Sequence, residues 1–105
     1  MSGRLGALDT QAATNELLYL APQNKTATVI VQFCNRTGTA ITVRLAHIDD
    51  NVITSIADED YLAYGVSVAA NATLEYRGIV VGSQHCLMTW ASAVDMSITC
   101  HGFEE

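Results

Sequence analysis

Alternation of apolar with other residues, at a period of two, is the feature that most constrains the fold of this chain. It recurs in the stretches 26–34, 40–47, 61–68, 73–81, 87–91 and 95–103. Successive side chains of a β-strand point to opposite faces, so this pattern predicts half-buried strands. The abundance of Val, Ile, Thr, Tyr and Phe in the same stretches supports that prediction.

The pattern also predicts which side chains face the core. The predicted inward sets are Val29, Val31 and Phe33; Ile41, Val43, Leu45 and His47; Leu62, Tyr64, Val66 and Val68; Leu74 and Tyr76; and Met96, Ile98 and Cys100. Trp90 is expected to join Tyr64 and Tyr76 in the core, because all three alternate with polar neighbours. Tyr61 has the opposite phase and is predicted to be an exposed aromatic side chain.

Turn-forming residues separate the predicted strands. Asn35-Arg36-Thr37-Gly38 predicts a hairpin turn with Gly38 at positive φ, and further breaks lie at 22–25, 70–72, 81–84 and 93–94. Breaks roughly every 8–12 residues are typical of antiparallel sandwiches and barrels. The predicted fold is therefore all-β: a single antiparallel β-sandwich of about 7–8 strands, Ig-like or jelly-roll-like, spanning residues 1–105.

Other segments depart from the alternation. Asp9–Leu20 is compatible with a short helix capped by its first residue, or with an edge strand over Leu17–Leu20. Asp49–Asp60 holds five of the eleven acidic residues and is expected to be a long connection, with a short helix or strand over Asn51–Ile56. The small residues of Met1–Leu8 predict a flexible N-terminal arm that orders against a neighbouring subunit by strand addition.

The charge balance limits the classes of partner. Lys and Arg number 5 and Asp and Glu number 11, which gives a net charge of −6. An acidic chain is poorly suited to binding nucleic acid or anionic lipid, so neither is expected as a partner. The sequence has neither an apolar run of roughly 18–20 residues nor the apolar core of a signal peptide, which predicts a soluble intracellular product.

Cysteine and histidine positions do not suggest a metal site. Cys34, Cys86 and Cys100 lie in apolar or alternating stretches and are expected to be small, reduced core residues. A site that also used His47, His85 and His101 would need ligand spacings that the sequence lacks. Neighbours such as His85 and Cys86 would moreover point to opposite faces of a strand.

No catalytic motif is present either. Asp58-Glu59-Asp60 lacks the ligand spacing of an EF-hand and is expected to be a solvated acidic turn. A nucleophile elbow and a phosphate-binding glycine loop are also missing from the sequence. We therefore expect no catalytic residue, no cofactor and no metal, and predict that the protein is not an enzyme.

Three residues are the candidates for contact with a partner protein. Arg36 lies in the first predicted turn, Arg44 lies on the polar face of the following strand, and Tyr61 is the predicted exposed aromatic. With so few basic residues, each arginine is expected to have an acidic partner, either within the chain or in a neighbouring subunit. Tyr61 also leaves open a carbohydrate-binding face.

Several short motifs, in order, resemble a known family. They are Leu18-Tyr19-Leu20-Ala21-Pro22, Lys25-Thr26-Ala27-Thr28-Val29, Phe33-Cys34-Asn35-Arg36, Ala40-Ile41-Thr42-Val43-Arg44-Leu45-Ala46, Asp58-Glu59-Asp60-Tyr61-Leu62-Ala63-Tyr64, Ala70-Asn71-Ala72-Thr73-Leu74-Glu75, Gly78-Ile79-Val80-Val81 and His101-Gly102-Phe103-Glu104-Glu105. From Leu18 to the C-terminus, the chain resembles small β-sandwich virion structural proteins of tailed bacteriophages. Cys86, Cys100 and His101 depart from the usual pattern of that family.

The resemblance implies a structural component of the virion, assembled in the host cytoplasm, without catalysis. The first expectation is a capsid decoration, or cement, protein that binds the lattice of the major capsid protein as a small homo-oligomer, a trimer or a dimer. A protein associated with the tail, baseplate or fibre is the alternative within the family. A carbohydrate-binding module for host recognition is a further alternative.

Overall fold

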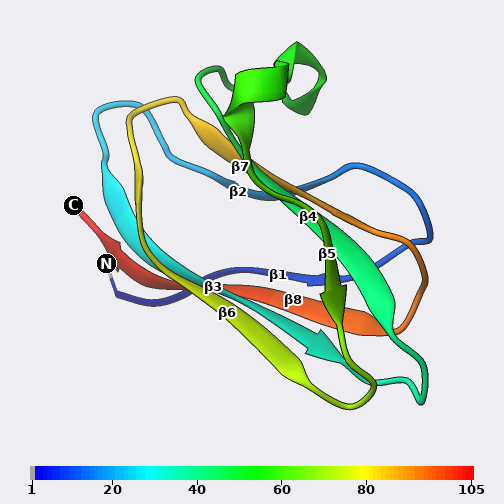
Figure 1. The fold of residues 1–105 in the computed structure, drawn as a ribbon. Helices are drawn as coiled ribbons and strands as arrows, with labels where there is room; N and C mark the ends of the chain where they lie inside the picture. The colour runs from blue at the N-terminus through cyan, green and yellow to red at the C-terminus, as the bar shows by residue number, and fades with distance from the viewer. Residues whose placement is uncertain (1) are drawn as a thin grey trace.

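Two packed layers of β-strands make up most of the described chain. The computed structural model describes residues 2–105 and contains two four-stranded sheets (Figure 1). The strands are β1 (Ser2–Asp9), β2 (Glu16–Leu20), β3 (Ala27–Asn35), β4 (Ile41–Ile48), β5 (Tyr61–Val68), β6 (Thr73–Val81), β7 (Cys86–Ala91) and β8 (Met96–Glu104). Two short 3-10 helices, η1 (Ile53–Ser55) and η2 (Asp58–Asp60), lie between β4 and β5. Bilayer-spanning helices are absent from these residues.

The strand order identifies the topology. One sheet has the order β1-β8-β3-β6 and the other β2-β7-β4-β5, and all neighbouring strands are antiparallel. Every connection except that between β4 and β5 passes from one sheet to the other. This order is that of an eight-stranded jelly roll. The prediction of an all-β antiparallel sandwich is confirmed, and of its two variants the structure has the jelly roll.

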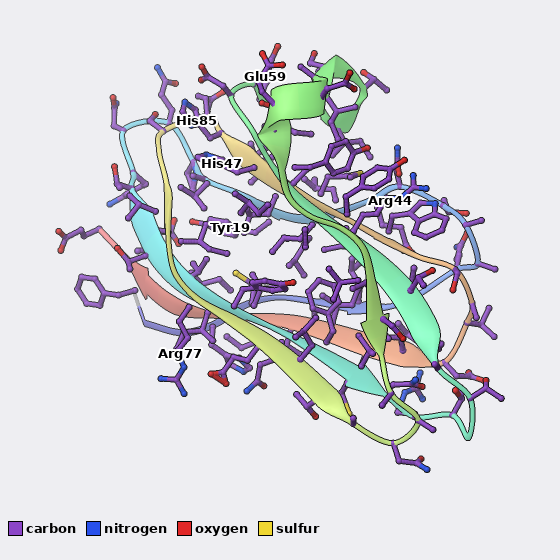
Figure 2. The ribbon with its side chains drawn as sticks, viewed as in Figure 1. Tyr19, Arg44, His47, Glu59, Arg77 and His85 are labelled. Carbon is purple, nitrogen blue, oxygen red and sulfur yellow. The ribbon has the colours of Figure 1, made fainter. Side chains whose placement is uncertain are left out.

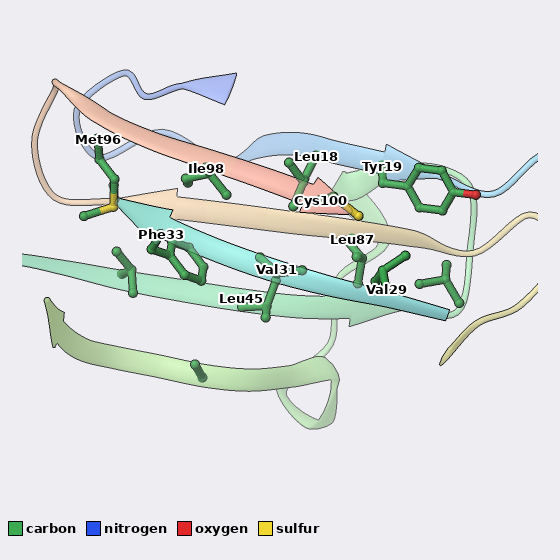
Figure 3. Packing of buried hydrophobic residues seen from close by; sticks show 14 of the residues in the cluster. Leu18, Tyr19, Val29, Val31, Phe33, Leu45, Leu87, Met96, Ile98 and Cys100 are labelled. Atoms are coloured by element: carbon green, nitrogen blue, oxygen red, sulfur yellow. The ribbon is translucent and has the colours of Figure 1, made fainter. Parts of the chain in front are cut away.

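The core lies between the two sheets and is built from the inward faces of the central strands. Phe33, Leu45, Leu87 and Ile98 are fully buried there (Figure 3). The alternation predicted for 26–34, 40–47 and 95–103 is confirmed, because the core-facing side chains of these stretches are buried except at the end of β4. β3 and β8 pair in register in one sheet, and β4 lies in the facing sheet. Their apolar faces meet between the sheets and form one continuous interior.

The four edge strands share a feature that the central pairs lack. Each edge strand contains at least one extra residue relative to its neighbour: β1 near Arg4, β2 near Leu17, β5 at Leu62 and at Gly65, and β6 at Gly78. The central pairs β3–β8 and β4–β7 run without any register shift. Such bulges twist an edge and interrupt its row of unpaired backbone groups. They therefore make addition of a strand from another molecule unfavourable.

The predicted flexible arm is a strand in the structure. β1 pairs with β8 from Ser2, opposite Phe103, to Asp9, opposite Ser97, and Met1 lies outside the described residues. One of the small residues that suggested mobility, Gly6, serves close packing instead. A Cβ atom added at Gly6 would lie 2.2 Å from the carbonyl oxygen of Leu18, so only glycine allows β1 to approach β2 so closely.

Two further predictions on local structure have clear outcomes. Glu16–Leu20 forms an edge strand, as one of the two alternatives for this region proposed, and the helical alternative is wrong. The connection 49–60 contains a short helix inside Asn51–Ile56, as one alternative proposed, and a second at Asp58–Asp60.

The predicted hairpin at Asn35–Gly38 is wrong, because β3 and β4 belong to different sheets. Gly38 is not among the glycines with positive φ, and the buried side chain of Asn35 organises the corner instead. Its Nδ2 donates hydrogen bonds to the carbonyl oxygens of Thr39, Val68 and Ala69 at 2.8, 3.0 and 3.2 Å. Its Oδ1 accepts from the backbone N–H and the hydroxyl of Thr37. One side chain thus ties together the β3–β4 and β5–β6 connections at this end of the sandwich.

This corner predicts a large loss of stability on substitution. Asn35→Ala should lower the free energy of unfolding by about 2–4 kcal/mol, because it leaves buried carbonyl oxygens without donors. Asn35→Asp should be similarly harmful, since a carboxylate has no N–H to offer. Arg36→Ala, at the next and exposed position, is the control and should cost less than about 1 kcal/mol. Urea unfolding measures all three, and an Asn35→Ala variant as stable as the parent would contradict the prediction.

Candidate interaction surface

The two outer faces of the sandwich differ in chemistry. The outer face of sheet β1-β8-β3-β6 carries polar side chains over much of its length, among them Gln32, Glu75, Arg77 and Thr99. The exposed apolar side chains of Val80 and Phe103 flank Thr28 at one end of this face. The outer face of sheet β2-β7-β4-β5 is mainly apolar and aromatic, with one arginine. An apolar face on a small protein is the feature that most often marks a contact with a partner.

Arg44 lies at the centre of the open part of that second face. Its backbone register places Tyr64 of β5 on one side and Trp90 of β7 on the other, so all three side chains project outward in a row. The guanidinium carbon of Arg44 lies 4.3 Å from the ring centroid of Tyr64 and 4.0 Å from that of Trp90. We call these residues the Tyr64–Arg44–Trp90 row. Figure 2 shows Arg44 and Arg77 on opposite sides of the sandwich.

The stacking fixes the orientation of the guanidinium group. Each cation–π contact is worth about 0.5–1 kcal/mol at an exposed site and about 2 kcal/mol when desolvated. The guanidinium group lies between the two aromatic rings, and its N–H donors lie in its own plane, in the fork geometry that carboxylates prefer. Among residues 2–105, Arg44 forms no ion pair, and its buried Nε has no hydrogen-bond acceptor. The expectation of an acidic partner for each arginine therefore fails for Arg44 within the described chain.

Tyr64 and Trp90 were predicted to be in the core, and that prediction is wrong for both. Tyr64 is 61% exposed, and Leu62 is also exposed, whereas Ala63 and Val68 are buried. The phase of β5 changes at Gly65, which has φ of +68° and opposes no residue of β4. A glycine inside a strand often marks such a bulge, so the signal for the error was present in the sequence.

The second half of the same face is covered by the connection between β4 and β5. Ala46, Ile48, Cys86 and Met88 project outward from β4 and β7 but are fully buried, in a small cluster of their own. Ile53, Ile56 and Tyr61 pack over them. The acidic connection is therefore a lid over an apolar surface rather than a solvated loop alone.

Tyr61 is half-buried in this cluster, so its prediction as a freely exposed aromatic needs correction. Its ring also meets that of Tyr64 edge to face, with centroids 4.9 Å apart. The side chain of Tyr61 therefore links the lid to the Tyr64–Arg44–Trp90 row. Of the three residues proposed for partner contact, Arg44 and Tyr61 belong to this one face.

Arg36 lies elsewhere. It forms an ion pair with Asp9 of β1, and its backbone N–H donates to the carbonyl oxygen of Asp95 at 3.2 Å. Its side chain is 44% exposed, so water weakens the pair. The structure thus gives Arg36 an acidic partner within the chain, at the end of β3 and away from Arg44.

A second polar arrangement, which the sequence did not suggest, lies at the far end of β4. His47 Nε2 is 3.1 Å from His85 Nδ1, and His85 Nε2 is 2.7 Å from the carboxylate of Asp49. A carboxylate only accepts, so His85 donates from Nε2; in the neutral ring Nδ1 then accepts from His47. Asn51 Nδ2 also donates to Gln84 Oε1 at 3.3 Å. These contacts fasten the start of the lid to the turn between β6 and β7.

The cysteines are free and differ in environment. Cys86 and Cys100 are buried as predicted, and burial raises the pKa of the Cys86 thiol and raises that of Cys100 to about 12. Cys34 is exposed on the outer face of β3, which corrects its prediction as a core residue. The described residues contain no cluster of three or more His, Cys, Asp or Glu side chains arranged to hold a metal ion.

Comparison with known proteins finds no family model, no curated protein and no solved structure that matches this chain.

The stack predicts a measurable effect on the single tryptophan. Arg44→Gln should lower the free energy of unfolding by about 1–2 kcal/mol, because both cation–π contacts disappear. The fluorescence of Trp90 should shift to longer wavelength as its covered ring face becomes hydrated. Arg77→Gln, on the opposite sheet, is the control and should leave the emission unchanged. Unaltered emission and stability in Arg44→Gln would show that the stack contributes nothing.

The histidine pair predicts a loss of stability in acid. Burial, followed by the positive charge that His85 can carry, lowers the pKa of His47, and Asp49 and Asp60 oppose this shift only partly. Since the folded state holds the His47 proton less tightly than the unfolded state, stability falls as pH drops through about 6.5.

Urea unfolding at pH values on both sides of 6.5 measures this effect. His47→Gln should flatten the dependence by up to one proton, while His101→Gln, on the other sheet, should retain it. An equal slope in His47→Gln and the parent protein would refute the assignment to this pair.

Proposed function

We propose that this chain is a non-enzymatic structural protein of a bacteriophage virion, a capsid decoration protein that binds the major capsid protein lattice as a small oligomer. The observation that carries the proposal is the open, arginine-centred aromatic row on one face of a jelly roll. Aromatic residues and arginine are enriched in protein–protein interfaces, where they often dominate the binding energy.

The fold and its edges support the same proposal. Jelly rolls are common in viral capsid proteins and in lectins, which is support by analogy of fold alone. The bulges in all four edge strands disfavour contact by strand addition and leave the faces for assembly. Because β1 is already paired with β8, the strand exchange expected of an N-terminal arm is replaced in this proposal by contact through a face.

Two alternatives differ from the proposal in location or ligand. A tail, baseplate or fibre protein would bind another virion component instead of the capsid lattice. A carbohydrate-binding module for host recognition draws support from the exposed ring of Tyr64, although Arg44 already covers one face of that ring. Labelling of the protein on intact particles separates the first alternative, and a glycan array tests the second.

Co-sedimentation with expanded capsids that lack the protein tests the proposal. The parent protein should pellet with expanded capsids and saturate at a fixed ratio to the major capsid protein. Arg44→Gln should weaken binding about tenfold or more, and Arg77→Gln should bind like the parent. Failure of the parent to pellet at any salt concentration would overturn the capsid assignment.

A further inference from the structure

We propose that the Tyr64–Arg44–Trp90 row binds a second copy of this chain, in a two-fold dimer in which Arg44 of each copy pairs with Asp58 and Glu59 of the other. This inference deepens the proposed function by naming the partner of that face, and it rests on that function only for its place in a virion.

The first step is the missing partner of Arg44. The guanidinium carbon of Arg44 lies 4.3 and 4.0 Å from two aromatic ring centroids, and within residues 2–105 no carboxylate pairs with it. Holding a cation in this fixed orientation is most favourable when an acceptor lies in its plane. The row is therefore complete only when a carboxylate arrives from outside the described chain.

The second step is the acidic turn on the same face. Asp58 and Glu59 of η2 are exposed and form no ion pair among the described residues. Asp60 differs, because its carboxylate accepts a hydrogen bond from the backbone N–H of Ala57 at 2.9 Å. Two carboxylates without an ion pair thus lie beside a third that is fixed in place. The guanidinium group of Arg44 from a second copy would relieve the repulsion among them.

The third step is the placement of these two features. η2 leads directly into Tyr61, which is opposite Ala46 in the sheet, two residues along β4 from Arg44. Arg44 and the acidic turn therefore lie at different points along one outer face. A two-fold axis that passes between Arg44 and the acidic turn places Arg44 of each copy against the acidic turn of the other copy. A surface of this kind is self-complementary, as two-fold dimers require.

The centre of the proposed contact is apolar. Leu62, 49% exposed, and Tyr64 follow the acidic turn along β5, and Tyr64 is opposite Arg44 in the sheet. An interface with an aromatic and aliphatic centre and charged pairs around it has the usual anatomy of a protein contact. A contact of standard size, about 800 Å² per partner, would cover roughly 15% of the 5371 Å² surface of the chain.

Sedimentation equilibrium with a charge exchange tests the inference. The parent protein should be a dimer, and Arg44→Glu should raise the dimer dissociation constant at least about tenfold, as should the double variant Asp58→Arg/Glu59→Arg. An equimolar mixture of the two variants should dimerise again, because each cross-pair then joins opposite charges. Arg77→Glu is the matched control and should dimerise like the parent. Circular dichroism confirms that each variant is folded.

The remaining outcomes overturn the inference. They are a monomeric or trimeric parent protein, a dimer that the single variants leave unchanged, and a mixture that stays monomeric. A monomer that still pellets with capsids refutes the dimer and the small oligomer, and leaves the binding to the capsid standing. A dimer that does not pellet with capsids supports the two-fold contact and refutes the capsid assignment. The two proposals therefore fail separately.

Discussion

Burial of the facing apolar sides of β3, β8, β4 and β7 is the interaction on which the rest of the structure depends. These four strands are central in their sheets, pair without register shifts, and contribute most of the fully buried side chains. Because side chains alternate along a strand, fixing Leu45 in the core also fixes Arg44 on the outer face. The Tyr64–Arg44–Trp90 row is thus positioned by the same packing that makes the fold stable.

The sequence was most informative where strands run without interruption. The inward faces of β3, β4 and β8 followed from alternation alone, because none of these strands contains an extra residue that shifts its phase. Tyr64 was assigned to the wrong face, because the bulge at Gly65 shifts the phase of β5 by one residue. The turn at Asn35 was interpreted as a hairpin, because polar turn residues suit a link within one sheet as well as a corner between two. The pairing of His47 with His85 depends on sheet topology, which alternation does not reveal.

The connection between β4 and β5 combines two chemical characters that are usually kept apart. Its acidic residues are mostly exposed, while Ile53 and Ile56 beneath them seal an apolar patch on the outside of the sheet. The patch would otherwise extend the open row across the whole outer face. The lid therefore limits the area of exposed apolar surface on this face and places negative charge at the border of that surface. The His85–Asp49 and Asn51–Gln84 contacts hold this lid at its first residues.

The interlocked order of the strands has a consequence for how the chain acquires its structure. Nearly all connections cross between layers, and β1 can be paired only after β8 has been synthesised. Contacts between distant parts of a chain are slow to form, since loop closure must precede any gain from pairing. Folding of this molecule is therefore expected to be late and slow relative to its synthesis. The same interlocking opposes piecemeal unfolding, since neither layer can peel away while the other remains intact.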